Sequence, residues 1–157
     1  MINILANDGI SQAGIDALTE KGFKVITEKV AQENLINTIN TKNYEVLLVR
    51  SATTVRKDLI DACPHLKLVG RGGVGMDNID VEYAKEKGIN VINTPAASSS
   101  SVAELVFAHL FGMVRFLFDS NRQMPMVGDS DFKSLKKSYA NGRELSGKTL
   151  GIIGFGR

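Results

Sequence analysis

The sequence has one cysteine, no tryptophan and only three prolines in 157 residues, and it has little net charge. A single cysteine, Cys63, excludes an internal disulfide and favours a reducing, cytoplasmic setting. No apolar run approaches the roughly 18 residues of a transmembrane helix, and the Met1–Leu5 start lacks the basic segment of a signal peptide. A formal net charge of +2 gives no reason to expect a nucleic-acid or membrane surface. These absences predict a soluble, cytoplasmic protein whose partners include neither nucleic acid nor membrane.

The chain is also poor in the residues of common catalytic centres. His65 follows Cys63-Pro64 in a link to a strand, and His109 lies among apolar residues in the middle of a helix. Neither has a neighbour in the sequence that would tune it, so both are interpreted as structural, and Cys63 as a packed thiol. Without metal-ligand spacing or a nucleophile–base pair, the sequence predicts no catalytic residue and no metal site.

What the chain does have is a regular alternation of apolar runs and amphipathic stretches over residues 2–95. The expected strands are Ile2–Ala6, Lys24–Thr27, Glu45–Val49, Leu66–Val69 and Asn90–Ile92. Each is short, unbroken and rich in Ile, Val and Leu, which is typical of parallel strands covered on both faces. Strands that alternate with helices through short links predict an α/β fold, a doubly wound parallel sheet with flavodoxin-like strand order.

Two of the intervening helices have readable ends. Ser11 is expected to cap a helix that turns Ile15 and Leu18 inward and closes at Gly22. Asp80 is expected to cap a second helix over 81–87, which closes at Gly88.

Polar residues and glycines follow the expected strands where their carboxyl ends should meet. They are Asn7-Asp8, Arg50-Ser51, Arg71-Gly72-Gly73-Val74-Gly75 and Asn93-Thr94-Pro95. Ligands of open α/β sheets bind at this edge, and glycines that expose successive N–H groups form an anion-binding concavity. Arg50 adds a planar cation that suits a carboxylate or phosphate, so the sequence predicts a pocket for a small acidic metabolite. The alternatives are a plain tight turn at the glycines and a surface ion pair at Arg50; no role is assigned to Arg71.

The second half begins with a capping box, Ser101 to Glu104, which predicts a helix to about Phe118. This helix is apolar on all sides and must therefore be covered on all sides. Residues 121–142 are expected to form an irregular arm.

Residues 148–153 predict a buried strand that runs into Gly154-Phe155-Gly156. This is how a dinucleotide-binding unit begins, with the pyrophosphate held at the N-terminus of the next helix. A glycine-rich turn is the alternative. The chain is expected to be the front part of a larger enzyme, ending before the G-x-G-x-x-G motif is complete.

Five segments together resemble the D-isomer-specific 2-hydroxyacid dehydrogenase family, most closely its phosphoglycerate-oxidising branch. The segments are LVRSAT (48–53), VGRGGVGMDNID (69–80), VINTP (91–95), SVAEL (101–105) and LSGKTLGIIGFGR (145–157). The resemblance implies a substrate-binding domain over residues 1–97 and the start of an NAD-binding Rossmann domain over 98–157. It also implies NAD-dependent oxidation of 3-phosphoglycerate, the first step of serine biosynthesis. Another 2-hydroxyacid (glycerate, glyoxylate, lactate) or a non-enzymatic NAD-sensing role of the same fold remain alternatives.

The resemblance also assigns roles to individual residues. It places the small anionic substrate against Arg50, Ser51 and the backbone of Gly73, Val74 and Gly75. Ser98 stands where some members have a substrate-binding Asn. Cofactor contacts are implied for Val74, near the nicotinamide, and for the glycine motif and the residue after it: Gly154, Gly156 and Arg157.

In this family a His, a Glu and an Arg carry the chemistry, and all three come from sequence beyond residue 157. The chain alone is therefore expected to be inactive and to hold NAD only weakly. The apolar helix 101–118, left without its covering elements, is expected to drive self-association.

Overall fold

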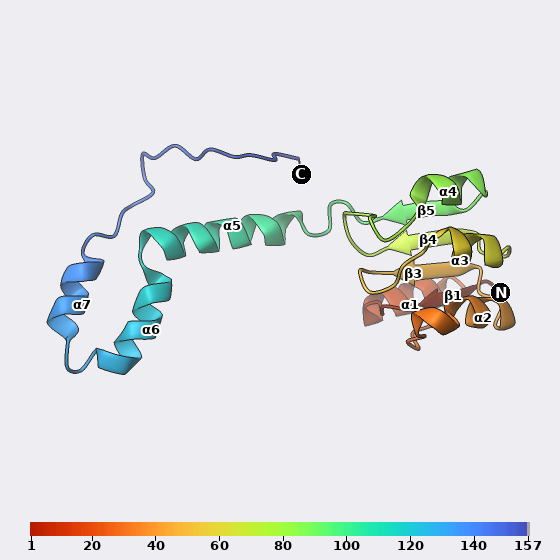
Figure 1. The fold of residues 1–157 in the computed structure, drawn as a ribbon, viewed down its shortest axis with the longest axis horizontal. Coiled ribbons are helices and arrows are strands. Elements are labelled where there is room, and N and C mark those ends of the chain that lie inside the picture. Colours follow the sequence, from red (N-terminus) through yellow and green to blue (C-terminus); the bar gives the residue numbers. More distant parts are fainter. Residues whose placement is uncertain (157) are drawn as a thin grey trace. The chain divides into compact units, whose positions relative to one another are not determined.

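A computed structural model describes residues 1–156 and divides the chain into two compact units, Met1–Ala97 and Ser98–Arg157. The first unit is a five-stranded parallel sheet in the order β2-β1-β3-β4-β5 (Figure 1). Its strands are β1 (Asn3–Ala6), β2 (Lys24–Ile26), β3 (Val46–Val49), β4 (Leu68–Arg71) and β5 (Asn90–Asn93). All five predicted strands and the flavodoxin-like order are confirmed.

The helices of this unit are α1 (Gln12–Glu20), α2 (Gln32–Thr41), α3 (Lys57–Ala62) and α4 (Val81–Glu86). Helix α3 contacts both α2 and α4, and all three bury side chains in one core with the sheet. From the sheet this core takes Leu5, Leu47, Val49 and Val69. Right-handed crossovers explain this arrangement, because the chain moves one way along the sheet after β2 and places these three helices on one face.

The opposite sheet face is covered less completely than predicted. Leu48 and Ile92 point away from the core residues of their strands, and Ile92 is 53% exposed. Helix α1 follows β1 in the other direction and buries no residue fully; Ile15 and Leu18 are only half-buried. The expectation of strands covered on both faces is therefore wrong for β3–β5 within this chain.

Both helices end at the predicted glycines, Gly22 and Gly88, but only one of the two predicted N-caps is present. The Ser11 hydroxyl accepts a hydrogen bond from the Gly14 N–H, as expected for an N-cap. Asp80 precedes α4 yet makes no cap bond to it. Its carboxylate instead accepts from the Lys57 N–H at 3.1 Å and from Arg56 at 3.0 Å, so it stabilises the start of α3.

The second unit contains α5 (Ser99–Val114), α6 (Leu117–Val127) and α7 (Phe132–Tyr139). The predicted capping box is wrong: the helix begins at Ser99, so Ser101 and Glu104 lie inside it. It ends before Phe116, whose φ of 55° breaks the helix. Residues 121–142, predicted to be irregular, are mostly helical in α6 and α7.

The end of the described chain also differs from its prediction. Residues 149–153 form no strand, and Ile153 is fully exposed. A strand needs a neighbour to satisfy its backbone groups, and the five-stranded sheet described here takes all its strands from residues 3–93.

Candidate functional site

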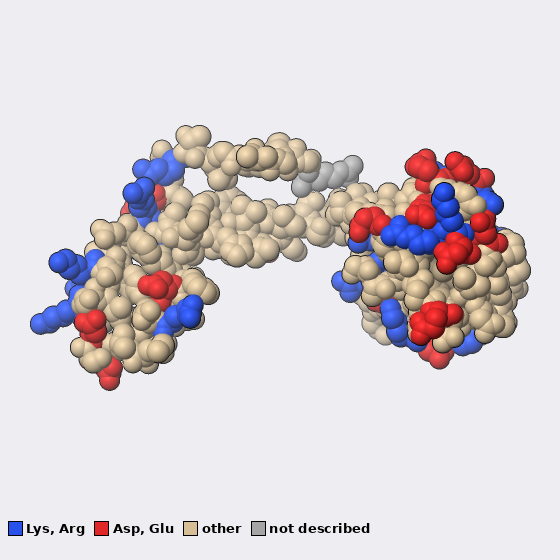
Figure 2. Space-filling view, viewed as in Figure 1, with Lys and Arg blue, Asp and Glu red and all other residues tan. Residues whose placement is uncertain are grey.

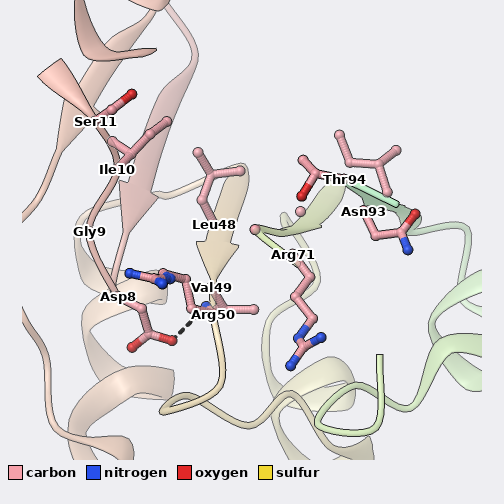
Figure 3. A pocket seen from close by; sticks show the side chains of 13 residues that line it. Asp8, Gly9, Ile10, Ser11, Leu48, Val49, Arg50, Arg71, Asn93 and Thr94 are labelled. Carbon is pink, nitrogen blue, oxygen red and sulfur yellow. Dashed lines mark hydrogen bonds between the residues drawn. The ribbon is translucent and has the colours of Figure 1, made fainter. Parts of the chain in front are cut away.

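Arg50 lies where the sequence places it, at the carboxyl end of the central strand β3. Val49 of β3 pairs with Arg71 of β4, so the two arginines come from neighbouring strands. They border one cavity of about 640 Å³ at this edge of the sheet (Figure 3). Its lining is Asp8, Gly9, Ile10, Ser11, Leu48, Val49, Arg50, Gly70, Arg71, Gly72, Ile92, Asn93 and Thr94.

The floor of this cavity is more apolar than a pocket for a small acidic metabolite requires. Leu48, Gly70 and Ile92 are register partners on adjacent strands, so they form one row on the less covered face of the sheet. Gly70 brings Leu48 close to β4: a Cβ at this position would lie 2.7 Å from Leu48 Cδ2. The polar edge around Arg50 is the part that suits an anion.

Arg50 also borders a second cavity of about 510 Å³, together with Ser51 and Lys29. Within residues 1–156 the Arg50 guanidinium takes part in no ion pair, which argues against the alternative of a surface salt bridge. Figure 3 shows the guanidinium groups of Arg50 and Arg71 pointing apart. Arg50 is therefore the cation available to a ligand at this edge.

The Asp8 side chain, only 4% exposed, anchors the loop that carries Arg50. One carboxylate oxygen accepts from the Arg50 N–H at 2.7 Å and the Thr53 N–H at 3.1 Å. The other accepts from the Thr53 hydroxyl and from the Lys29 ammonium. Burial alone would raise the pKa of Asp8, but these donors and the Lys29 charge lower it to about 2.

This carboxylate makes the first unit sensitive to acid. Because the folded pKa of Asp8 is about 2 against an ordinary 3.8, the ionised form stabilises the fold above about pH 4. That contribution, about 2 kcal/mol, is lost as the pH falls from about 4 to 2. We expect Asp8→Asn to be less stable than wild type near neutral pH and to converge with it near pH 2. Urea unfolding of wild type and Asp8→Asn from pH 7 to pH 2 measures the difference in their free energies of unfolding. A difference that does not change with pH would contradict the low pKa of Asp8.

The glycine loop after β4 offers fewer free donors than the sequence suggests. The Gly72 N–H donates to the Val49 carbonyl at 2.9 Å, and the Gly73 N–H donates to the Arg71 carbonyl at 3.0 Å. For Val74 and Gly75 the described part of the chain supplies no acceptor. The predicted concavity of successive free N–H groups is therefore reduced to the second half of the loop.

Arg71, to which the sequence assigned no role, explains two of the glycines. Its side chain is 13% exposed, its guanidinium donates to the Gly75 carbonyl, and it lies 3.8 Å from the Asp77 carboxylate. A Cβ at Gly73 would lie 3.1 Å from Arg71 Nη1, and one at Gly75 would lie 3.3 Å away. Neither glycine has a positive φ. Close approach of the Arg71 guanidinium favours glycine at position 73, and at position 75 the Asp77 carboxylate, 3.2 Å from the site of a Cβ, adds to it. In the sequence, the one feature that could have indicated this packing of Arg71 is the glycine-rich loop that follows it.

The other predicted substrate residues are distributed as follows. Gly73, half-exposed Val74 and Gly75 continue the loop beyond Gly72 and do not line the larger cavity. The loop is held beside β5, because the Thr94 N–H donates to the Gly73 carbonyl and the Asn93 amide donates to the Val74 carbonyl. Ser98 lies in the second unit, immediately before α5.

The predicted cofactor residues at the end of the chain lie in the second unit as well. Gly154 has a φ of +84°, a left-handed conformation that favours glycine, and both Gly154 and Gly156 are exposed. Arg157 lies outside the described residues.

The residues interpreted as structural lie away from the two cavities that Arg50 borders. Cys63 is fully buried, and burial raises the pKa of its thiol to about 11. His65 and His109 are both exposed, and neither lines the cavities around Arg50. In residues 1–156 no group of three potential metal ligands is found. No single described helix is long and apolar enough to cross a membrane; α5 and α6 pass that test only as a pair bent by 55°.

Comparison with known proteins agrees with this architecture. The pattern of the D-isomer specific 2-hydroxyacid dehydrogenase catalytic domain matches residues 4–146. D-3-phosphoglycerate dehydrogenase of Methanocaldococcus jannaschii is 43% identical over the whole chain, which covers 28% of that relative. Hydroxypyruvate reductase of Thermotoga maritima is 42% identical over 96% of the chain and 47% of its own length.

A solved structure gives the same result. The NAD⁺-bound 3-phosphoglycerate dehydrogenase of Entamoeba histolytica is 26% identical and superposes with a TM-score of 0.60, covering 73% of this chain and 39% of that one. The chain thus spans less than half the length of each of these relatives. On the match over residues 4–146, it belongs to the D-isomer-specific 2-hydroxyacid dehydrogenase family.

Proposed function

We propose that this chain is the substrate-binding part of an NAD-dependent dehydrogenase that oxidises 3-phosphoglycerate to 3-phosphohydroxypyruvate, the first step of serine biosynthesis. The observation that carries the proposal is Arg50 at the carboxyl end of β3, which borders both cavities at this edge and whose guanidinium has no ion-pair partner within residues 1–156. The whole-chain similarity to a D-3-phosphoglycerate dehydrogenase supports this choice of substrate.

In this proposal Arg50 binds the carboxylate or phosphate of the substrate, and Ser51 offers a hydroxyl beside it. The N–H groups of Val74 and Gly75 supply further donors, and Gly73 belongs to the same loop. Ser98 is proposed as a further substrate contact through its hydroxyl. Binding at the anionic ends of the substrate holds its C2–H bond in a fixed direction, which is catalysis by positioning.

The chemistry that bound NAD would supply is an acceptor for the hydride from C2. The positive φ of Gly154 fits the turn that a pyrophosphate site requires. We propose that Gly154, Gly156 and Arg157 hold the pyrophosphate and that Val74 lies near the nicotinamide. These residues are only part of a nucleotide site, so weak binding of NAD by this chain alone is expected.

A second candidate is a dehydrogenase or reductase for another 2-hydroxyacid. The 42% identity to a hydroxypyruvate reductase favours it, since Arg50 would bind the carboxylate of any such acid equally well. Steady-state kinetics of the full-length enzyme with phosphorylated and unphosphorylated 2-hydroxyacids separates the two candidates.

We also propose that α5 mediates self-association. Its only charged residue is Glu104, and the face of α5 visible in Figure 2 carries no charged side chain. Phe107 and Phe111 are 49% and 55% exposed, with ring centroids 6.5 Å apart. Exposed apolar patches of this kind mark interaction surfaces, and a second copy of the same helix would cover it by two-fold symmetry.

Light scattering on this chain tests the self-association. We expect the mass of a dimer at micromolar concentration and a monomer for the double variant Phe107→Glu/Phe111→Glu, because four buried carboxylates would oppose the contact. Phe132→Glu on α7, also at an exposed phenylalanine, is the control and should remain dimeric. A monodisperse wild-type monomer with α5 ordered would reject this interface.

A further inference from the structure

The short loop from Arg50 to Thr53 carries two of the proposed substrate residues but has no regular secondary structure. Arg50, Ser51 and Ala52 are all exposed, so packing does not hold them in place. An exposed loop of this kind is normally mobile, whereas a bound anion requires a guanidinium in a fixed position. Contacts at the two ends of the loop supply the rigidity that anion binding requires.

On one side, the Asp8 carboxylate binds the N–H groups of both end residues. Its distances to the Arg50 and Thr53 nitrogens are 2.7 and 3.1 Å. On the other side, the Asn78 amide donates to the carbonyl oxygens of the same two residues, Arg50 and Thr53, each at 2.7 Å. The N–H and the C=O of both loop ends are thus each bound by a side chain.

These two side chains are buried and come from distant parts of the sequence. The Asp8 side chain is 4% exposed and Asn78 is 5% exposed, although Arg50, Ser51 and Ala52 of the loop face solvent. The backbone of Asn78 is itself held, because its main-chain carbonyl accepts from the Val55 N–H at 2.8 Å. Asn7 completes the network by donating to the Thr53 hydroxyl at 2.9 Å. Thr53 is buried, so its backbone groups need partners within the protein, whereas Arg50 is exposed and water could satisfy its backbone groups. The two bonds that buried side chains make to Arg50 therefore fix the position of its backbone.

We propose that Asp8 and Asn78 are positioning residues, a clamp that holds the ends of the Arg50–Thr53 loop so that the Arg50 guanidinium and Ser51 hydroxyl face the substrate. This inference rests on the proposed function, in which Arg50 binds an anionic group of the substrate. Neither clamp residue is assigned a contact with the substrate. Their effect is transmitted through the backbone of Arg50 and Thr53.

The test uses the full-length enzyme with 3-phosphoglycerate as the probe. Asn78→Asp replaces the donating amide by an oxygen that faces two carbonyls, and we expect KM to rise about tenfold with kcat nearly unchanged. Asp8→Asn, which keeps the shape of the side chain, is expected to act in the same direction. Asn40→Asp is the matched control, because Asn40 also donates to a backbone carbonyl, that of Ala62 at 2.8 Å, outside both cavities.

A double-mutant cycle separates positioning from general destabilisation. In an Arg50→Ala background, Asn78→Asp should raise KM less than twofold, because the cation that it positions is already absent. An unchanged KM in Asn78→Asp, the same rise in both backgrounds, or an equal rise in Asn40→Asp would overturn the inference. If Arg50→Ala itself leaves KM unchanged, Arg50 does not bind the substrate and the proposed function is wrong. The positioning role of Asp8 and Asn78 is then rejected as well, because it depends on substrate binding by Arg50.

Hydrogen exchange on the unmodified chain keeps the inference testable if the variants do not fold. The Arg50 and Thr53 amides, which donate to Asp8, should exchange much more slowly than those of Ser51 and Ala52 between them. Equal rates at all four positions would show that the loop is not clamped.

Discussion

Replacing Arg50 by alanine in the full-length enzyme is expected to raise KM for 3-phosphoglycerate by roughly 10- to 150-fold. A hydrogen bond to a charged group contributes about 1.5–3 kcal/mol, and the Arg50 guanidinium has no competing partner among the described residues. Because Arg50 is exposed and its anchoring contacts are made by the backbone, stability should hardly change. Steady-state kinetics and a thermal melt of the same preparation measure both quantities.

Arg50→Lys and Arg71→Lys are the informative controls. Lysine keeps the charge at position 50 but not the planar pair of donors, so an intermediate KM is expected. Arg71 is paired within its own loop, so Arg71→Lys should affect stability more than substrate affinity. Unchanged kinetics in Arg50→Ala would show that Arg50 is a surface residue and that the glycine loop is a plain turn.

The second prediction with a large effect is that the 157-residue chain alone shows no dehydrogenase turnover. Oxidation of an alcohol needs a group that accepts the hydroxyl proton near neutral pH. The carboxylate that lines the larger cavity is Asp8, with a pKa of about 2, and the guanidinium groups of Arg50 and Arg71 offer hydrogen-bond donors but no acceptor. His65 and His109 lie outside both cavities.

Incubation of the purified chain with 3-phosphoglycerate and NAD measures this directly, with the full-length enzyme as the positive control. NADH formation above a protein-free blank would mean that a residue of this chain carries the proton. The circular dichroism spectrum should show a folded α/β protein, so that the absence of turnover is not the result of unfolding.

The sheet could be predicted from the sequence because each strand is indicated by a short run of neighbouring residues. Unbroken runs such as the one ending at Val49 are long enough for a strand and too short for a helix. The strand order follows from short links and right-handed crossovers. Arg50 was found by the same local logic, since residues that follow parallel strands meet at one edge of the sheet.

What the sequence could not supply depends on long-range contacts. The Asp8 and Asn78 contacts join positions 42 and 28 residues apart from Arg50, and no local pattern indicates them. Asp80 matched a cap signature, but its carboxylate is bound by Arg56 and Lys57 instead. The serine run before Val102 offers several possible helix starts, which explains why the capping box at Ser101 was misleading.

The second unit shows the limit of reading apolar pattern alone. Helix α6 was missed because it contains Pro125 and few apolar residues at regular spacing. Residues 149–153 have the composition of a buried strand, but no strand within residues 1–156 pairs with them. A strand forms only when another strand binds its edge.

The most direct test of the account is the ratio of kcat/KM values of the full-length enzyme for 3-phosphoglycerate and for glycerate, measured with NAD at saturating concentration. The two acids differ only in the phosphate. In the proposed function the phosphate gains hydrogen bonds from Arg50 or from the N–H groups of Val74 and Gly75. A hydrogen bond to a charged group contributes about 1.5 kcal/mol or more, which predicts at least a tenfold preference for 3-phosphoglycerate. Equal values, or a preference for the unphosphorylated acid, would contradict the proposed function and favour a dehydrogenase for another 2-hydroxyacid.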